Sequence, residues 1–426
     1  MSTSLPIDAD ASAEEAREIV REWIERALPP TWREAGDRGG PAAVREVRTR
    51  AEYEAWYPVF AATGLVVPTW PVAYGGLDVR VEVARAIEAE LAPYHLGRLN
   101  PLGLNNTASA LFAHGTEQQR LRFLPPIVRN EERWCQLFSE PGAGSDLASL
   151  GCRAERDGDD WIVSGQKVWT TWAHRSEFGI LLARTDPDRP KRRGITYLLL
   201  DLRQPGVEIR PLRHIGGAVD FNEVYLDAAR VPDAHRVGAV DDGWRVAGAT
   251  LAGERQMVAG AGSGGVDRIG GRGAEHLLSV ARSSGANTDP RVRQRLVAIW
   301  AEERIRGWTN DRVRARVRAG HAPGPESSIG KVHNADLNLR TQLLAAELLG
   351  ARAMAFAAPD FAPDDIGTDY AAALPVEVAG MLRSRANSIE GGTTEINKTI
   401  LAERVLGLPR EPDPYRDTNW RDTPRN

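Results

Sequence analysis

The sequence has almost no cysteine: Cys135 and Cys152 are the only two in 426 residues. Two cysteines make no disulfide framework, and their spacing is not that of a structural metal site. Such a low cysteine content is typical of proteins in a reducing compartment. No run of about 18 apolar residues occurs, as a membrane-spanning helix would need. Residues 1–11 are acidic and polar and have no apolar signal-peptide core. The composition therefore predicts a cytoplasmic protein that does not insert into membranes.

Lysine is also scarce, since it occurs only at positions 167, 191, 331 and 398. The positive charge is otherwise carried by arginines scattered along the chain, which indicates a compositional bias rather than a binding patch. The formal net charge is −4 and the isoelectric point is about 6.1. A weakly acidic chain without a basic patch gives no reason to expect a nucleic-acid partner.

At 426 residues the chain is long enough for two or three domains, each with its own core. Helical patterns dominate residues 1–132, short β-rich runs follow in 133–243, and helical patterns return in 244–409. We therefore expect an α+β fold that is mostly α: an N-terminal helical domain, a small middle β-domain and a C-terminal domain similar to a four-helix bundle. The polar, proline-containing tail, 410–426, is expected to be poorly ordered.

Several elements follow from hydrophobic spacing and from turn residues. In the first domain Thr116 is expected to cap a helix that ends at Phe123-Leu124-Pro125-Pro126. Asp157–Asp160 is a hairpin turn signal, and the charged segment 186–193 is expected to be a loop in solvent. The expected helices are 13–27, 52–63, 81–91, 108–114, 246–259, 275–281, 292–318, 327–349, 376–389 and 395–406, and the expected strands are 161–163, 178–183, 195–202, 207–209 and 224–232.

A glycine-rich pattern, G-x-G-x-x-G, occurs at 260–265. A dinucleotide-binding fingerprint would need a strand before it and a helix after it. The residues before it have a helical pattern and no alternation of strands and helices follows, so we interpret the pattern as local chain flexibility.

The stretch 134–172 carries the strongest functional signal. A short apolar strand runs into the loop Ser139-Glu140-Pro141-Gly142-Ala143-Gly144-Ser145-Asp146, whose small residues let the backbone approach a flat ligand. A following strand carries Trp169 and Thr171, which share a face because strand side chains alternate. An indole beside a hydroxyl suits a planar heteroaromatic cofactor.

This loop and strand together resemble the acyl-CoA dehydrogenase family of flavoproteins, in which a T/S-E-P-x-A-G-S-D loop and a W-x-T strand hold the isoalloxazine ring of FAD. The resemblance implies that Phe138 and Ser139 meet the pyrimidine side of the flavin. It also implies that Trp169 packs on the ring and that Thr171 bonds near flavin N5. The cofactor-binding residues that it implies are Gln136, Phe138, Ser139, Gly144, Ser145, Trp169, Thr171, Arg282, Gln294, Thr393 and Glu395.

Desaturation of an acyl thioester requires a base for the α-proton and donors that hold the carbonyl oxygen. In many family members the base precedes a G-T-[ST] motif, but this position is Gly391 here, and Glu390 lies one place too early. Isovaleryl- and long-chain-type members place the base in an earlier helix before an arginine, as Glu254 and Arg255 would. The resemblance therefore implies that Glu254 is the base and that the Gly391 N–H serves the carbonyl. Ser145 and Arg255 would contact the substrate. The alternative for Glu254 is an ordinary ion pair on a helix.

Arg282 matches the family's arginine that reaches the FAD pyrophosphate of a neighbouring subunit, and Gln294 matches a nearby glutamine on the following helix. The phenylalanine and glycine after the family's arginine are missing here, and its glycine motif is altered at Gly350-Ala351-Arg352. The resemblance thus implies a homodimer or homotetramer, or else a hetero-oligomer in which a partner completes the site.

We expect the activity to be FAD-dependent α,β-desaturation of an acyl-CoA, with the β-hydride passing to flavin N5 and the electrons to an electron-transferring flavoprotein. Two alternatives stay open. The first is an acyl-CoA oxidase-type enzyme that uses oxygen. The second is a half-site or non-catalytic subunit of a hetero-oligomer. The length and branching of the acyl group are not readable from the sequence.

Overall fold

The computed structural model describes residues 4–258, 273–319, 324, 327–358, 360, 362 and 367–424, without the side chains of 252–258, 314, 317, 318 and 327. The chain divides into two compact units. The first is Met1–Cys135 with Arg175–Gly179, and the second is Gln136–His174 with Ile180–Asn426. The pattern at 260–265 lies outside the described residues.

The first unit is helical and is built around aromatic side chains. Its helices are α1 (Ala13–Ala27), α2 (Pro30–Val47), α3 (Arg50–Ala61), α4 (Val81–Leu91), α5 (Ala108–His114) and α6 (Glu117–Val128). In α1, Ser12 caps the first turn, and Ala16, Val20, Trp23 and Ile24 are buried on one face. The expected helices 13–27, 81–91 and 108–114 are confirmed.

Two features of this unit were not expected. No helix was assigned to residues 30–47, where α2 forms; the helix is kinked at Gly40, whose φ of 61° is not helical. Helix α6 runs two residues beyond the expected end at Phe123-Leu124-Pro125-Pro126 and ends at Val128. Its start is as expected: the Thr116 hydroxyl accepts the Gln119 N–H, and the Gln119 side chain accepts the Thr116 N–H, at 3.2 and 3.0 Å.

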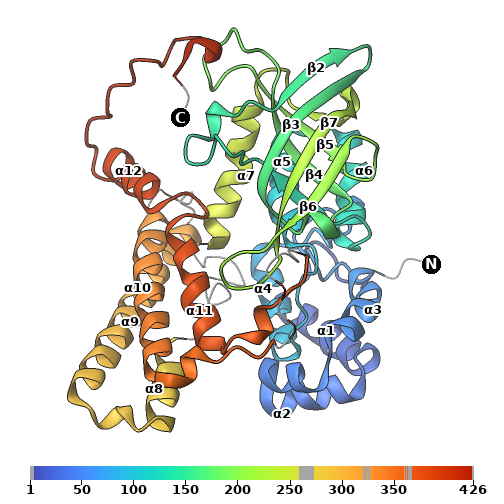
Figure 1. Ribbon diagram of the computed structural model, residues 1–426. Coiled ribbons are helices and arrows are strands. Elements are labelled where there is room, and N and C mark those ends of the chain that lie inside the picture. Colours follow the sequence, from blue (N-terminus) through green and yellow to red (C-terminus); the bar gives the residue numbers. More distant parts are fainter. Residues whose placement is uncertain are drawn as a thin grey trace. The chain divides into compact units, whose positions relative to one another are not determined.

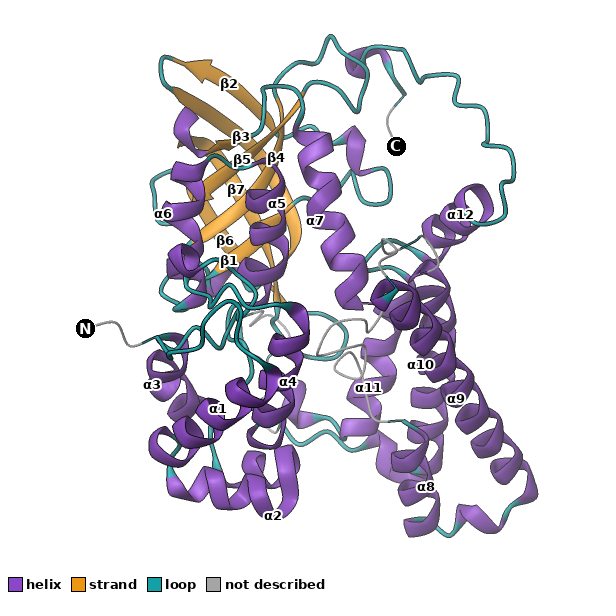
Figure 2. Cartoon of the chain, turned by 180° about the vertical axis from the view of Figure 1, so that it is seen from behind, coloured by secondary structure: helices purple, strands orange, loops and turns teal. Residues whose placement is uncertain are grey.

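The sheet lies within residues 134–237 and contains eight strands (Figures 1 and 2). Its order is β6-β7-β3-β2-β4-β5-β8, and β1 pairs with β4. The expected hairpin is confirmed, because Asp157 pairs with Asp160 and Gly158 has a φ of 60°. The strands are β1 (Trp134–Leu137), β2 (Arg153–Asp157), β3 (Asp160–Thr171), β4 (Phe178–Arg184), β5 (Ile195–Asp201), β6 (Val207–Leu212), β7 (Phe221–Pro232) and β8 (Arg236–Val237).

The helices of the second unit are α7 (Gly243–Val258), α8 (Ala274–Ser283), α9 (Pro290–Arg318), α10 (Ser327–Leu348), α11 (Val376–Ser384) and α12 (Thr394–Arg404). A cluster of buried residues joins α8, α9 and α10, and these helices lie side by side in both views (Figures 1 and 2). The expected helix 376–389 is too long, because α11 ends at Ser384 and the chain tightens into a 3-10 turn at Arg385–Ser388. Within the described residues, no helix combines the length and apolar character needed to cross a membrane.

The tail differs from its expectation. Residues Trp420–Asp422 form a 3-10 turn, and the Trp420 N–H donates to the Arg189 carbonyl at 2.8 Å. The charged loop 186–193 is consequently covered in part instead of being simply solvated. The sequence pattern gave no sign of this contact, because the two partners are far apart along the chain.

Candidate flavin site

The glycine-rich loop is attached to strand β3 by its backbone. The Val168 N–H donates to the Ser139 carbonyl at 2.9 Å. Within the loop, Glu140 and Ala143 exchange two backbone hydrogen bonds, each 3.1 Å long. A Cβ added at Gly142 or Gly144 would meet no atom within 4 Å, so open space lies beside both residues. The loop therefore has a fixed shape and an accessible backbone.

A buried ion pair holds the base of this loop. Lys167 is fully buried, and its ammonium group donates to Glu140 Oε1 at 2.7 Å and to the Phe138 and Leu182 carbonyls at 3.2 and 2.8 Å. Glu140 also accepts the N–H groups of Gly151 and Cys152, at 2.7 and 3.0 Å. Each charge is thus compensated by an opposite charge and by further hydrogen bonds, as burial of an ion pair requires.

Trp169 presents its indole to the surface at a break in the strand. It lies in a β-bulge, because the four residues of β3 from Lys167 to Thr170 face only three of β7, from Val224 to Asn222, and its φ is 60°. The side chain is 55% exposed, which is unusual for a tryptophan in a sheet. Thr170 points to the buried side, and its hydroxyl has no hydrogen-bond partner among the described residues. Thr171 is half-buried, on the opposite side from Thr170.

The other residues that we expected to contact the flavin differ in how exposed they are. The ring of Phe138 is 3% exposed and packs edge-on against Tyr197, so it belongs to the core of the unit. Gln136 is half-buried in β1, whereas Gly144 and Ser145 are exposed. Ser139 is half-buried at the start of the loop.

Phe221 connects the Trp169 surface with the loop before α12. Its ring lies edge-on to Trp169 with centroids 5.6 Å apart, and the Arg383 guanidinium lies 5.9 Å from its centroid. Arg383 in turn makes a two-pronged ion pair with Glu390, at 2.8 and 3.2 Å. The second unit therefore brings Trp169 and the segment around Gly391 to the same region, although they are distant in the sequence.

His214 adds a neutral polar group to this region. Its ring lies 5.9 Å from Phe221, and its Nδ1 accepts the Gly216 N–H at 2.9 Å, which leaves the proton on Nε2. Burial, and then the charge of Arg383, lower the pKa of His214. The imidazole is therefore uncharged near neutral pH.

The structure describes the side chain of Glu390 but not that of Glu254, the two candidate bases. Glu390 is engaged by Arg383 and also accepts a hydrogen bond from Asn387 at 3.2 Å. Gly391 and Gly392 have φ values of 64° and 82°, a region that favours glycine over residues with a side chain. Glu254 and Arg255 lie in α7, but their side chains fall outside the described part of the chain.

The remaining expected cofactor residues lie on helix ends of the second unit. Thr393 caps α12, and its hydroxyl accepts the Ile396 N–H at 3.2 Å. Glu395 is exposed in the first turn of the same helix. Arg282, in the last turn of α8, and Gln294, in α9, are also exposed. Within the described residues, no hydrogen bond, ion pair or ring contact joins any of the four to Trp169 or Phe221.

Comparison with known proteins identifies the family. Three family models cover the chain in order: "Acyl-CoA dehydrogenase, N-terminal domain" matches residues 10–131, "middle domain" matches 135–229 and "C-terminal domain" matches 241–406. The chain is 38% identical to acyl-CoA dehydrogenase IpdE1 of Mycobacterium tuberculosis, over 93% of this chain and 98% of that protein. The chain belongs to the acyl-CoA dehydrogenase family. It is thus a flavoprotein and an oxidoreductase that acts on CH–CH groups.

Other relatives and solved structures agree with this assignment. Acyl-CoA dehydrogenase FadE34 of M. tuberculosis is 40% identical over 87% of this chain, which matches 48% of that protein. The Tcur3481-Tcur3483 steroid ACAD has a TM-score of 0.69 at 25% identity, covering 95% of this chain and 100% of that chain. The ChsE4-ChsE5 complex from M. tuberculosis has a TM-score of 0.67 at 25% identity, covering 94% and 98%.

The residues at the loop and strand fit a flavin. The open space beside Gly142 and Gly144 and the exposed indole of Trp169 provide a flat, accessible surface. Sequence reasoning did not single out Phe221, His214 or Arg383, whose proximity depends on how α11 meets the sheet. It also overlooked the Glu140–Lys167 pair, although a lysine in a chain that otherwise uses arginine was an available signal.

Proposed function

We propose that the chain is an FAD-dependent acyl-CoA dehydrogenase that desaturates an acyl-CoA thioester between its α and β carbons. The observation that carries the proposal is the exposed Trp169 indole beside the hydrogen-bonded loop Ser139–Asp146. A strand tryptophan in a pure scaffold would be buried. Ser139, Ser145, Trp169 and Thr171 would hold the FAD, and a bound FAD would accept the β-hydride at N5.

The residues of the chain would then handle the proton and the carbonyl. Glu254 takes the α-proton as its carboxylate, and the C–H electron pair moves into the new double bond. The Gly391 N–H donates to the thioester oxygen as negative charge builds on it. Ser145 and Arg255 bind the substrate. The Arg383–Glu390 pair supports this division of roles, because Glu390 already neutralises an arginine.

The physiological acceptor of the electrons is proposed to be an electron-transferring flavoprotein, and the compartment to be the cytoplasm. Oxygen is the alternative acceptor. The substrate is an acyl-CoA whose chain can be straight, branched or polycyclic. Because one similar solved structure is a steroid ACAD, a steroid side-chain CoA thioester belongs among the first compounds to test.

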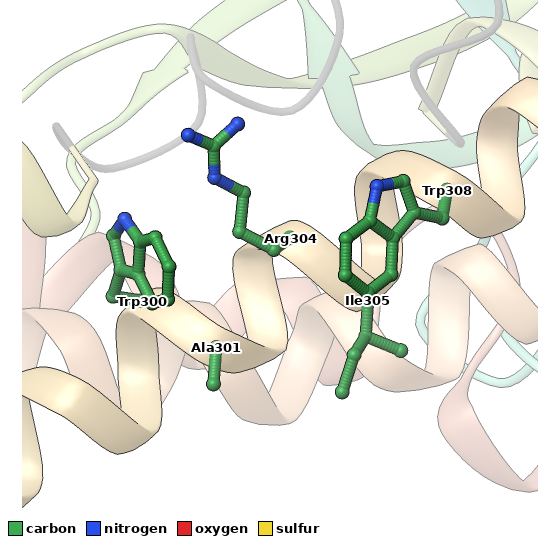
Figure 3. Close-up of a pocket in the computed structure, with 5 residues that line it drawn as sticks. All are labelled: Trp300, Ala301, Arg304, Ile305 and Trp308. Atoms are coloured by element: carbon green, nitrogen blue, oxygen red, sulfur yellow. The ribbon is translucent and has the colours of Figure 1, made fainter.

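An oligomer is proposed because helix α9 presents an apolar face to solvent. Trp300, Ile305 and Trp308 are 51%, 50% and 65% exposed. With Ala301 and Arg304 they line a shallow pocket along the helix (Figure 3). Tryptophan and arginine are typical of the energetically dominant residues of protein interfaces. A second copy of this chain would cover the face in a homodimer or homotetramer, with Arg282 and Gln294 reaching the partner's FAD.

A hetero-oligomer is the second arrangement, in which a different family member covers α9. The similar ChsE4-ChsE5 and Tcur3481-Tcur3483 structures each pair two differently named chains. Light scattering on the chain expressed alone distinguishes the two. A homo-oligomer that carries FAD supports the first arrangement, and an FAD-free monomer that gains FAD with a partner supports the second.

Anaerobic titration tests the activity. The flavin-loaded protein is mixed with straight, branched and steroid acyl-CoAs, and the absorbance of oxidised flavin is followed. We expect at least one thioester to bleach the flavin and to yield the enoyl-CoA. A loaded protein that no acyl-CoA bleaches would contradict the proposal. Adding an electron-transferring flavoprotein or oxygen to the bleached enzyme then identifies the acceptor.

A further inference from the structure

The end of the chain lies on the β-domain, within the same unit. We call residues Asn419–Thr423 the C-terminal strap; the red segment that leaves α12 leads to it in Figure 1. The strap is bound by its backbone, since Trp420 N–H donates to the Arg189 carbonyl at 2.8 Å and Arg421 N–H to the Pro187 carbonyl at 3.1 Å. The Arg421 guanidinium also pairs with Asp188 at 2.6 Å. Backbone bonds fix the position of the strap without depending on one side chain.

The indole of Trp420 lies on the segment that follows the glycine-rich loop. Its Nε1–H donates to the Ser149 carbonyl at 3.1 Å. A Cβ built on Gly151 would lie 3.5 Å from ring atom Cζ2, so the ring is in close proximity to this glycine. Trp420 therefore contacts both ends of the short segment Ser149–Gly151.

The ring of Trp420 also covers a buried cation. The Arg184 guanidinium lies 4.9 Å from the ring centroid, and Arg184 is 3% exposed. Arg184 donates to the Ala148 carbonyl at 2.6 Å and to the Lys191 and Arg193 carbonyls at 3.0 Å each. Its charge thus connects the segment after the glycine-rich loop with the loop 186–193, and an aromatic face stabilises such a desolvated guanidinium.

This segment in turn sets the position of the glycine-rich loop. The Gly151 N–H donates to Glu140 Oε2, inside the loop, at 2.7 Å. At the other end of the loop, Asp146 accepts hydrogen bonds from Ser149 at 2.5 Å and from Lys191 at 2.7 Å. A displacement of Ser149–Gly151 would therefore reach Glu140 and Asp146 directly.

We infer that Trp420 is a positioning residue for flavin binding, and that the C-terminal strap holds the loop Ser139–Asp146 in its ligand-ready shape. The inference rests on the proposed function, since it takes FAD to bind at this loop. Trp420 itself touches Ser149, Gly151 and Arg184, so it acts through the loop and not on the cofactor.

The test compares Trp420→Ala with Trp420→Phe and Tyr415→Ala in the full chain. Tyr415 is an exposed tail residue and serves as the matched control. FAD affinity is measured by reconstituting the apoprotein, and hydrogen exchange is measured for the backbone amides of residues 139–152. We expect Trp420→Ala to weaken FAD binding about tenfold, the scale of losing one such contact, and to speed amide exchange at Gly151 and Cys152. Trp420→Phe, which keeps a ring over Arg184, should recover part of both, and Tyr415→Ala should match the wild type.

The two proposals fail in different ways. Unchanged amide exchange at 139–152 in Trp420→Ala overturns the role of the strap, whether or not FAD binds. Unchanged FAD affinity together with faster exchange also overturns it, because the loop shape would then not matter for the cofactor. A wild-type protein that has protected amides but binds no FAD, even with partner chains, instead overturns the proposed function.

Discussion

Two regions of the second unit expose tryptophan, and they do so in different ways. Trp169 is held at a β-bulge, next to a loop that the ion pair between Lys167 and Glu140 holds in place. Trp300 and Trp308 project from one face of a regular helix, with Arg304 near the ring of Trp300 at 5.4 Å. A constrained backbone around an exposed ring suits a small planar ligand. A regular helix with an apolar face suits another protein surface.

Breaking the ion pair between Lys167 and Glu140 should have the largest effect. Lys167→Met leaves the Glu140 carboxylate nearly buried and without its cation, which costs about 3–5 kcal/mol of unfolding free energy. Chemical denaturation measures this loss. Lys398→Met, at an exposed position of α12, is the control and should change the free energy by less than about 0.5 kcal/mol. Equal denaturation midpoints for the two variants would show that the pair does not stabilise the loop.

Changing the apolar face of α9 should alter the oligomeric state. Replacing both Trp300 and Trp308 with Ala removes two large apolar side chains, and each such interface residue can contribute about 2 kcal/mol or more to association. We expect the oligomer to dissociate at low micromolar concentration in light scattering, while the circular dichroism of the subunit is kept. Val81→Ala, which removes an exposed apolar side chain from α4, is the control. An oligomer that survives the double change would place the interface elsewhere.

The two candidate bases, Glu254 and Glu390, should differ in their effect on turnover. Glu254→Gln keeps the shape of the side chain but removes the proton acceptor, so turnover should fall about 10²-fold or more while FAD still binds. Glu390→Gln should keep most of the activity, because Glu390 is engaged by Arg383. Stopped-flow flavin reduction with a reactive acyl-CoA measures both. A near-normal Glu254 variant beside an inactive Glu390 variant would assign the base to Glu390.

The smallest effect is expected at the flavin surface itself. Trp169→Ala removes one aromatic face, a contribution of about 0.5–1.5 kcal/mol, so FAD should bind up to about tenfold more weakly. The oligomer should be unchanged, in contrast to the Trp300 and Trp308 variant. Equilibrium dialysis of the reconstituted protein against FAD gives the affinity. Unchanged affinity would show that the exposed indole serves another purpose.

Much of the fold followed from local patterns. The hydrophobic spacing of α1 and α4, the Thr116 cap and the Asp157–Asp160 hairpin are local signals, and each appears in the structure as expected. Helix α2 did not follow, since glycine and proline at 39–41 disfavour a helix, and the structure has a non-helical kink at Gly40. The order of the helical, β and helical domains could be predicted because the spacing of apolar residues changes from one domain to the next.

The site was readable only where it is local. The loop Ser139–Asp146 and the strand with Trp169 lie close in the sequence, and their backbone contact confirms that the two motifs are adjacent. The Phe221–Arg383–Glu390 contacts and the docking of Trp420 join residues that are far apart in the chain, and no periodicity encodes them. The roles of Glu254, Arg255, Arg282 and Gln294 stay predictions.

The scarcity of cysteine has an experimental consequence. Cys135 belongs to the first compact unit and Cys152 to the second, and both are buried. Burial raises the pKa of Cys135 to about 12 and that of Cys152 to about 11, so the reactive thiolate is scarce in the folded protein. A thiol reagent will modify each cysteine only when its own surroundings open. Mass spectrometry of the two labelled peptides therefore measures how fast each unit opens.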